Sequence, residues 1–279
     1  MTVVAIWFEP TEQVLWSVAD TRISAPGPTG GSTIMTDSGA KLFAIPIHCH
    51  ASRMNLEFRK KTLYQSSVGY AFAGDVLPAT MTFATASTFL QNLTTVGSDE
   101  PPRLSEIAAM IGLLGQRFSK EALGSSNGSY GKFIAAVFGW CPTLNRFAIY
   151  KLTPRLTPSK FEMQIEETLP DDNVSIVSFG TGAARLIQRL DDIRRFGDKY
   201  HRTAHLPKIA VEKLIEEDMG DVGGSLSIGA ATRDGFRLYS YVTPIVMGKP
   251  EARISFNGID LGENAGLIGH YMISVDGIA

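Results

Sequence analysis

The chain begins, after Met1, with the stretch TVVAIWFEPTEQVLWSVADTR, residues 2–22. An apolar run over Thr2–Phe8 is followed by a polar turn with a proline at Glu9–Glu12, and a second apolar run leads to Arg22. Two such runs around a short turn predict a β-hairpin. The first run is apolar without alternation, which is typical of a strand that is covered on both faces. This stretch therefore predicts a fold in which a sheet is buried.

A threonine in the second position also suggests a particular chemistry. Methionine aminopeptidases remove Met1 when the next residue is small, and the hairpin would then begin with a free Thr2. One residue would carry both a hydroxyl nucleophile and an α-amino base, which is a recognised way to activate a hydroxyl. An α-amino group, with a pKa of roughly 7.7–8.0, is partly in its free-base form at pH 7. Thr2 is therefore a candidate nucleophile, although a threonine at this position is also common without any such role.

The composition is that of an ordinary globular protein. The 279 residues are 44% hydrophobic and 19% charged, which is ample material for a core. A net charge of −2 and a pI of about 6.2 give no electrostatic reason to expect nucleic acid or an anionic membrane as a partner. No apolar run reaches the roughly 18 residues of a membrane span, and the N-terminus lacks the basic region of a secretory signal. Two cysteines do not make a disulfide framework, so we expect a cytoplasmic protein that needs no cofactor.

The order of predicted elements indicates the fold class. Helical spacing of apolar residues predicts helices over residues 75–93, 104–123, 182–196 and 207–219, with strands before, between and after the two pairs. That order buries both sheets between helical layers, so we predict an α+β protein built as a four-layer αββα sandwich. The domain would span residues 2–242. Residues 243–279 would be a C-terminal extension of unknown role, either an edge hairpin or a subunit-contact arm, and His48–Gln65 an extended hairpin or surface arm.

Four segments resemble, in order, the proteasome β-type subunits and their bacterial HslV-type relatives, which are N-terminal-nucleophile hydrolases. Thr2 with the strand that ends in ADTR at residues 19–22 resembles the start of these subunits. Gly39–Phe43 is similar to the lysine strand, and Gly69–Asp75 to an apolar strand that ends in Ala-Gly. Phe179–Ala183 is similar to a Gly-Ser-Gly turn before a long helix. The four together are far more specific than any one alone.

The resemblance implies a set of site residues. It assigns the nucleophile and the base to Thr2, electrostatic tuning to Lys41 and Asp20, and the oxyanion donor to the backbone N–H of Gly74. Thr181 would take the family's serine position near the amino terminus. Substrate binding would fall to Arg22, Ile23, Ser24, Phe43, Phe72 and Val76. Because most of these are apolar, the pocket should prefer an uncharged residue before the scissile bond.

One departure from the family pattern bears on activity. The family commonly places an aspartate three residues before a Ser-Gly-Gly, and both side chains support the terminal amine. Here Val222 stands before Gly223–Gly224, and Met219 takes the aspartate position. Asp218 or Asp221 could substitute after a shift of register.

The resulting prediction is a threonine endopeptidase that cleaves peptides or unfolded proteins. By resemblance it would act inside a homo-oligomer of rings or stacked rings, with or without an ATPase unfoldase. Two alternatives stay open: an inactive scaffold subunit, which the missing aspartate and serine favour, and an amidase for small molecules. No metal site is predicted, because on a strand Cys49 would point away from His48 and His50.

Overall fold

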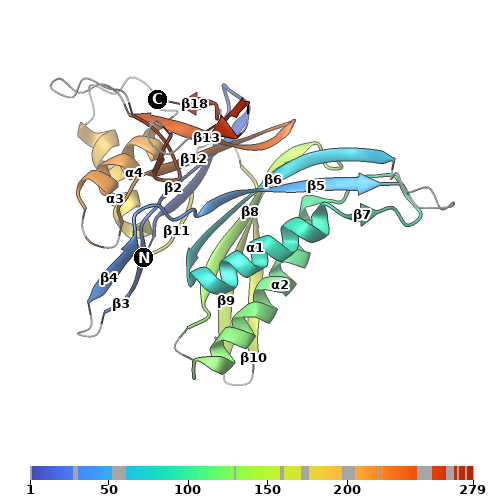
Figure 1. Cartoon of the computed structure of the whole chain (residues 1–279), viewed down its shortest axis with the longest axis horizontal. Helices are drawn as coiled ribbons and strands as arrows, with labels where there is room; N and C mark the ends of the chain where they lie inside the picture. The colour runs from blue at the N-terminus through green and yellow to red at the C-terminus, as the bar shows by residue number, and fades with distance from the viewer. Residues whose placement is uncertain are drawn as a thin grey trace.

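The structure, a computed structural model (Figure 1), describes residues 2–27, 31–51, 61–128, 130–157, 160–170, 176–196, 205–218, 220, 222–243, 253–261, 267–268, 270–273 and 275–278. The predicted N-terminal hairpin is confirmed by β1 (Val4–Glu9) and β2 (Val14–Asp20), which pair antiparallel. All six residues of β1 are buried, as its unbroken apolar character predicts.

The hairpin belongs to the first of two large sheets. This eight-stranded sheet has the order β11-β1-β2-β12-β13-β14-β15, and β18 pairs with β13. Its other strands are β11 (Val177–Phe179), β12 (Leu226–Thr232), β13 (Gly235–Thr243), β14 (Arg253–Phe256), β15 (Ile259–Asp260) and β18 (Gly277–Ile278). Residues 253–260 thus form a hairpin at the sheet edge, which is one of the two alternatives for the C-terminal extension.

The second sheet has six strands in the order β10-β9-β8-β6-β5-β7. They are β5 (Leu42–His50), β6 (Thr62–Gly74), β7 (Leu93–Thr94), β8 (Phe133–Cys141), β9 (Arg146–Thr157) and β10 (Lys160–Thr168). The expected hairpin at His48–Gln65 is confirmed where β5 pairs with β6, while residues 52–60 lie outside the described part. Two small ribbons complete the strands: β3 (Ile23–Pro26) with β4 (Ser32–Thr36), and β16 (Leu267–Ile268) with β17 (Tyr271–Met272).

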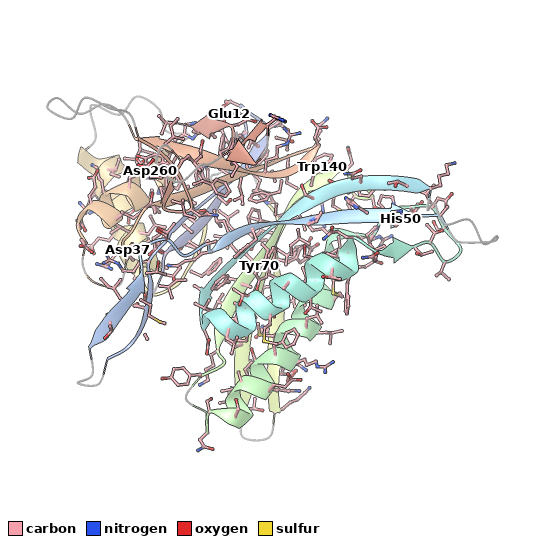
Figure 2. The ribbon with its side chains drawn as sticks, viewed as in Figure 1. Glu12, Asp37, His50, Tyr70, Trp140 and Asp260 are labelled. Atoms are coloured by element: carbon pink, nitrogen blue, oxygen red, sulfur yellow. The ribbon has the colours of Figure 1, made fainter. Side chains whose placement is uncertain are left out.

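The predicted helices are present to within a few residues: α1 (Val76–Leu90), α2 (Leu104–Ser125), α3 (Ala183–Phe196) and α4 (Leu206–Glu216). The carboxylate of Asp75 caps α1 by accepting from the Leu77 amide at 3.2 Å. Helices α1 and α2 lie along the second sheet, and α3 and α4 lie beside the first (Figure 1). Figure 2 shows Tyr70 between α1 and the second sheet, where its hydroxyl donates to the Ala79 carbonyl at 3.1 Å.

Three apolar clusters hold these parts together. One lies between the two sheets and includes Ile6, Leu42 and Phe138. The second packs the six-stranded sheet on α1 and α2, and the third packs the eight-stranded sheet on α3 and α4. Val4, two residues after Thr2, belongs to the cluster between the sheets, and Val3 belongs to the cluster under α3 and α4.

The predicted α+β class with a four-layer αββα sandwich is wrong. Strands make up 45% of the structure and helices 28%, so the molecule is mostly β-sheet, with four helices in the described part of the chain. Two sets of strands escaped the sequence prediction. β10 alternates buried Phe161 and Met163 with outward polar residues, and β3 pairs with β4 in a segment between Ile23 and Thr36 where no strand was predicted. These strands, with those of the C-terminal extension, shift the balance toward β-structure.

Candidate active site

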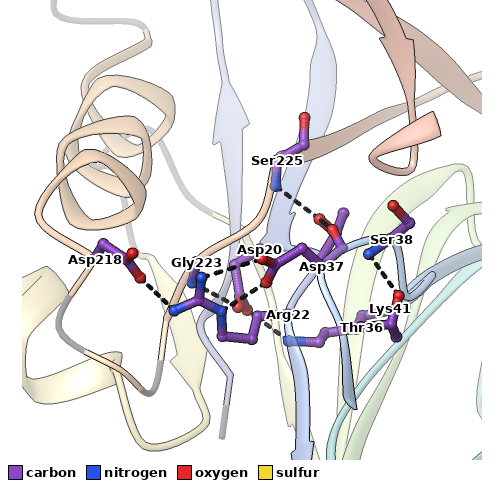
Figure 3. A network of polar contacts seen from close by, with 10 residues as sticks. Asp20, Arg22, Thr36, Asp37, Ser38, Lys41, Asp218, Gly223 and Ser225 are labelled. Atoms are coloured by element: carbon purple, nitrogen blue, oxygen red, sulfur yellow. Dashed lines mark hydrogen bonds and ion pairs between the residues drawn. The ribbon is translucent and has the colours of Figure 1, made fainter. Parts of the chain in front are cut away.

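A buried ion pair connects the end of β2 to the segment just before β5. The Lys41 ammonium lies 2.8 Å from the Asp20 carboxylate, and both side chains are almost completely buried. The β1–β2 register sets Val4 opposite Ala19, so Asp20 comes next to the first residues of the chain. Its carboxylate also accepts from the Val3 amide at 3.0 Å and from the Gly223 amide at 3.2 Å. Asp20 therefore joins Val3 to Lys41 and to the loop after α4, and Figure 3 shows its contacts with Lys41 and Gly223.

The environment of Lys41 perturbs its ionisation. Burial lowers the pKa of Lys41 below the ordinary lysine value, and the Asp20 carboxylate opposes this shift by attracting the charged form. The positive charge of Arg22 lowers it further. Arg22 itself has a raised pKa, chiefly because it donates a hydrogen bond to Asp37, so it stays charged. The lysine is thus more easily deprotonated than a surface lysine, although it has a carboxylate partner.

Thr2 lies beside the turn before α3. Its backbone nitrogen donates to the Thr181 hydroxyl at 3.2 Å, and its carbonyl accepts from the Gly182 amide at 3.0 Å. Gly180 has a φ of +97°, and a Cβ at that position would collide with the Thr2 carbonyl. Only glycine allows both the left-handed backbone and this close approach. Thr181 therefore lies next to Thr2.

Gly74 ends β6 with a φ of +111° and is exposed. The preceding residue, Ala73, lies near Gly180, because a Cβ on Gly180 would be 3.3 Å from the Ala73 Cβ. β6 also pairs with the strand of Lys41, where the Phe72 amide donates to the Lys41 carbonyl at 3.1 Å. Hydrogen bonds thus join Thr2 to Thr181 and Lys41 to Asp20, Asp20 also binds the amide of Val3, the residue after Thr2, and Gly74 ends the strand that borders them.

The predicted substrate-binding residues fall into two groups. Ile23 and Ser24 on β3, Phe43 on β5 and Val76 on α1 are partly exposed. By contrast, Phe72 is only 1% exposed and packs on Phe43 within the core, with ring centroids 6.1 Å apart. Arg22 is also buried and forms ion pairs with Asp37 at 2.7 Å and with Asp218. Phe72 therefore lies inside the core, Arg22 is held by two carboxylates, and the side chains of the first group are partly open to solvent.

A pocket of about 470 Å³ opens beside Arg22. Its lining is polar and does not include the apolar residues that were predicted to form a specificity pocket. The residues are Arg22, Asp37, Ser38, Ile215, Glu216, Asp218, Gly224, Ser225 and Gly258. Gly258 belongs to the C-terminal extension, to which the sequence assigned no role. This extension therefore reaches the pocket beside Arg22. The Asn257–Gly258 pair is a hairpin-turn signal that is visible in the sequence.

The departure from the family pattern persists in the structure. Val222 is fully buried and packs against Gly182, where a Cβ would lie 2.7 Å from the Val222 Cγ2. Asp218 forms an ion pair with Arg22. Among the described residues, we find no contact that joins this carboxylate to Thr2. Met219 and Asp221 lie outside the described residues. Thr181 is the residue whose hydroxyl accepts a hydrogen bond from the Thr2 nitrogen, at 3.2 Å.

His48 and His50 share one face of β5, with ring centroids 6.4 Å apart, and Cys49 is buried on the other face. Within the described ranges, no group of three or more potential metal ligands comes together.

No helix in the same ranges is long and apolar enough to cross a membrane.

Comparison with known proteins gives a likeness of fold. No family model matches the chain, and no curated protein matches it. Among solved structures, it is similar to the "Helical Assembly of the Anbu Complex from Pseudomonas aeruginosa", a proteasome-like assembly, with a TM-score of 0.50 and 12% identity over 86% of each chain. An identity this low shows the fold alone. With no matching family model and a mostly β-sheet fold, the predicted membership of the proteasome β-type and HslV-type family is wrong as stated, and the comparisons support only a similarity in fold to a proteasome-like assembly.

Proposed function

We propose that this chain is a threonine-type N-terminal-nucleophile peptidase, which becomes active when Met1 is removed. The observation that carries the proposal is the buried Asp20–Lys41 pair, 2.8 Å apart and bonded to the Val3 amide. Burying two charges costs several kcal/mol per ion before their attraction is counted. Apolar residues could fill the same space at lower cost. A charge pair attached to the residue after Thr2 is therefore best explained by a chemical role next to Thr2.

In the proposed reaction, the Thr2 hydroxyl oxygen forms a bond to the carbonyl carbon of the substrate and gives its proton to the α-amino group. The Lys41 ammonium disfavours protonation of that amine, so more of it is in the free-base form. The carbonyl oxygen becomes an oxyanion, for which the Gly74 N–H is the proposed donor. The C–N bond then breaks, and the leaving amine takes the proton from the α-ammonium. Water hydrolyses the remaining ester and regenerates Thr2.

The supporting residues have distinct roles in this scheme. Asp20 holds Lys41 in place and favours its charged form. The Thr181 hydroxyl, 3.2 Å from the Thr2 nitrogen, would orient the free amine toward the hydroxyl. Substrate would extend along β3, with its backbone at Ser24 and an uncharged side chain near Ile23 and Val76. Peptides or unfolded segments are the proposed substrate class, because an extended chain can lie along a strand.

We also propose that copies of the chain assemble, as the structural neighbour does in its helical assembly. Helix α1 supports this, because its 15 residues include no charged side chain although one face is exposed. Leu77, Met81 and Phe89 on that face are 63%, 41% and 54% exposed. Large apolar side chains gathered on an exposed, uncharged face are typical of a protein contact surface.

A second copy of α1 fits this exposed face. Small Ala84 lies near the middle of the helix, while large side chains stand toward both ends. An antiparallel pairing about a two-fold axis near Ala84 would place Phe89 of one copy near Leu77 and Met81 of the other. No charge would be buried in the contact, so neither helix would resist it electrostatically.

The test of the activity uses protein whose intact mass shows that Met1 is gone. Thr2→Ala and Lys41→Ala should abolish hydrolysis of short, uncharged fluorogenic peptides while the protein stays folded. Lys120→Ala, which changes an exposed lysine of α2, is the matched control and should keep full activity. Activity that survives in Thr2→Ala would refute the assignment of the nucleophile.

An inactive scaffold is the second candidate, and one observation favours it. Val222 brings an apolar side chain to the position where the family has a hydroxyl, and Asp218 is engaged by Arg22. A protein that has lost Met1, assembles, and yet fails to react with a threonine-directed electrophile would support the scaffold over the peptidase.

A further inference from the structure

The C-terminal hairpin of β14 and β15 reaches the candidate site through its turn. The two strands are joined by Asn257 and Gly258, whose φ angles are both positive, at 50° and 81°. Positive values at both central residues define a type I′ turn, for which Asn-Gly is the preferred sequence. β14 pairs with the edge of β13, which carries the turn toward the loop before Lys41.

This turn is bonded to residues near the site on two sides. The Ser38 hydroxyl donates to the Gly258 carbonyl at 3.0 Å, and the Ser227 hydroxyl donates to the Asn257 side-chain oxygen at 2.7 Å. The Gly258 backbone lies so close that a Cβ there would be 2.8 Å from the Asp37 carbonyl and 3.1 Å from the Thr21 hydroxyl. The contact is polar and close, so it depends on the shape of the turn and not on burial of apolar surface.

The segment beneath the turn leads directly to the ion pair. The Asp37 carbonyl accepts from the Thr21 hydroxyl at 2.5 Å, and its carboxylate binds Arg22 at 2.7 Å. Thr21 and Arg22 follow Asp20, the residue that holds Lys41 and the Val3 amide. Figure 3 shows this network from Asp37 and Arg22 to Asp20 and Lys41. A displacement of the Asp37–Ser38 segment would therefore be passed on to the residues around Thr2.

We propose that the β14–β15 hairpin is a positioning element for the Thr2 site. Its Asn257–Gly258 turn contacts the Asp37–Ser38 segment and holds it against Thr21. In this way it keeps the side chains of Asp20 and Lys41 in position beside Thr2. Gly258 and Ser38 also form one wall of the pocket beside Arg22. The turn residues act through their neighbours and do not touch the reacting atoms. This inference rests on the proposed peptidase function, which it extends to the C-terminal segment.

A pair of glycine variants distinguishes the loss of the contact between the turn and Asp37 from the effect of backbone strain alone. Gly258→Ala places a methyl group against Asp37, whereas Gly97→Ala has the same kind of backbone, with φ +84° against +81°, and nothing within 4 Å of its Cβ. Both variants carry the same conformational penalty. We expect kcat on a fluorogenic peptide to fall by about tenfold to a hundredfold in Gly258→Ala, with little change in KM, and to stay unchanged in Gly97→Ala. Ser38→Ala, which removes only the bond to Gly258, should show a smaller loss in the same direction.

Hydrogen exchange gives a readout that does not depend on catalysis. The Gly39 amide donates to the Thr21 carbonyl at 2.8 Å, and the Gly223 amide donates to Asp20. Both amides should exchange faster in Gly258→Ala than in wild type or Gly97→Ala. Faster exchange together with lower kcat supports the positioning role. A change in only one of the two measurements, or in neither, overturns it.

The two proposals can fail separately. If the wild-type protein, with Met1 removed, shows no hydrolysis, the peptidase proposal is refuted, and the catalytic side of the positioning role falls with it. The exchange rates of Gly39 and Gly223 then still decide whether the hairpin clamps this segment. If wild type is active and Gly258→Ala behaves like Gly97→Ala, only the positioning role is refuted.

Discussion

Replacing Lys41 by methionine tests the electrostatic centre of the proposed site. Lys41→Met keeps an apolar side chain of similar length but leaves the fully buried Asp20 carboxylate without its cation. Removing one partner of a buried ion pair typically costs about 3–5 kcal/mol of unfolding free energy. Asp20 keeps two donors, the Val3 amide at 3.0 Å and the Gly223 amide at 3.2 Å. Because these still stabilise the carboxylate, we expect a loss near the lower limit, about 3 kcal/mol.

The double variant Asp20→Asn/Lys41→Met isolates the interaction. It removes both charges, so its destabilisation should be smaller than the sum of the two single variants by about 1–3 kcal/mol. The exposed pair of Arg117 and Glu121, 3.1 Å apart on α2, provides the control. Arg117→Met should leave the free energy of unfolding unchanged within error, because an exposed pair contributes little.

The assay is urea unfolding followed by tryptophan fluorescence from Trp7, Trp16 and Trp140. Protein concentration must be held constant, because assembly would make the apparent stability depend on it. Two results would refute the reasoning: a Lys41→Met protein within about 1 kcal/mol of wild type, where ordinary substitutions fall, or exact additivity in the double variant. Either would mean that the pair contributes no coupling to the fold.

Three further predictions follow from the same geometry. Gly180→Ala should lower both stability and peptidase activity, because its Cβ would collide with the Thr2 carbonyl, whereas Gly97→Ala should lower stability slightly and leave activity intact; equal activities would contradict this. The pKa of Lys41 is lowered in the folded state, so the unfolded state binds more protons between that pKa and the ordinary value of 10.5, and stability must rise with pH there. The unfolding free energy of wild type minus that of Lys41→Met should therefore increase from pH 7 to 9.5, and a flat or falling difference would count against a lowered pKa. Finally, Phe89→Glu should dissociate assemblies by placing a charge in the α1 contact, which light scattering would detect as a fall in mass; an unchanged mass would exclude α1 as the contact surface.

Much of the candidate site could be proposed from short sequence motifs. The strand that ends in Asp20, the lysine at position 41 and the glycine-rich turn at Thr181 lie in segments whose local pattern is clear. Tertiary packing put the Phe72 ring into the core and paired the Arg22 guanidinium with Asp37 and Asp218. Both outcomes depend on neighbours remote in the sequence. Periodicity within one strand carries no information about them.

In the C-terminal segment, the local structure could be predicted but its tertiary contact could not. Asn257–Gly258 is a strong local signal for a hairpin, yet a turn signal alone does not say which surface the turn contacts. Only the pairing of β14 with β13 brings Gly258 to Asp37, more than 200 residues earlier in the chain. The role proposed for this hairpin therefore could not be read from the sequence.

Local apolar periodicity was enough to predict the hairpin of Thr2–Arg22, the four helices and most of the strands, because it is a property of each segment alone. It did not determine the class of the fold. The balance between strands and helices depended on β10 and the β3–β4 ribbon, whose stability comes from pairing with distant or adjacent strands as well as from propensity. The tertiary structure alone decided that Asp20 would meet Lys41 and that Thr181 would meet Thr2. Such contacts form only when separate strands pack, since hydrogen bonds and buried charges are stabilised by partners from other parts of the chain.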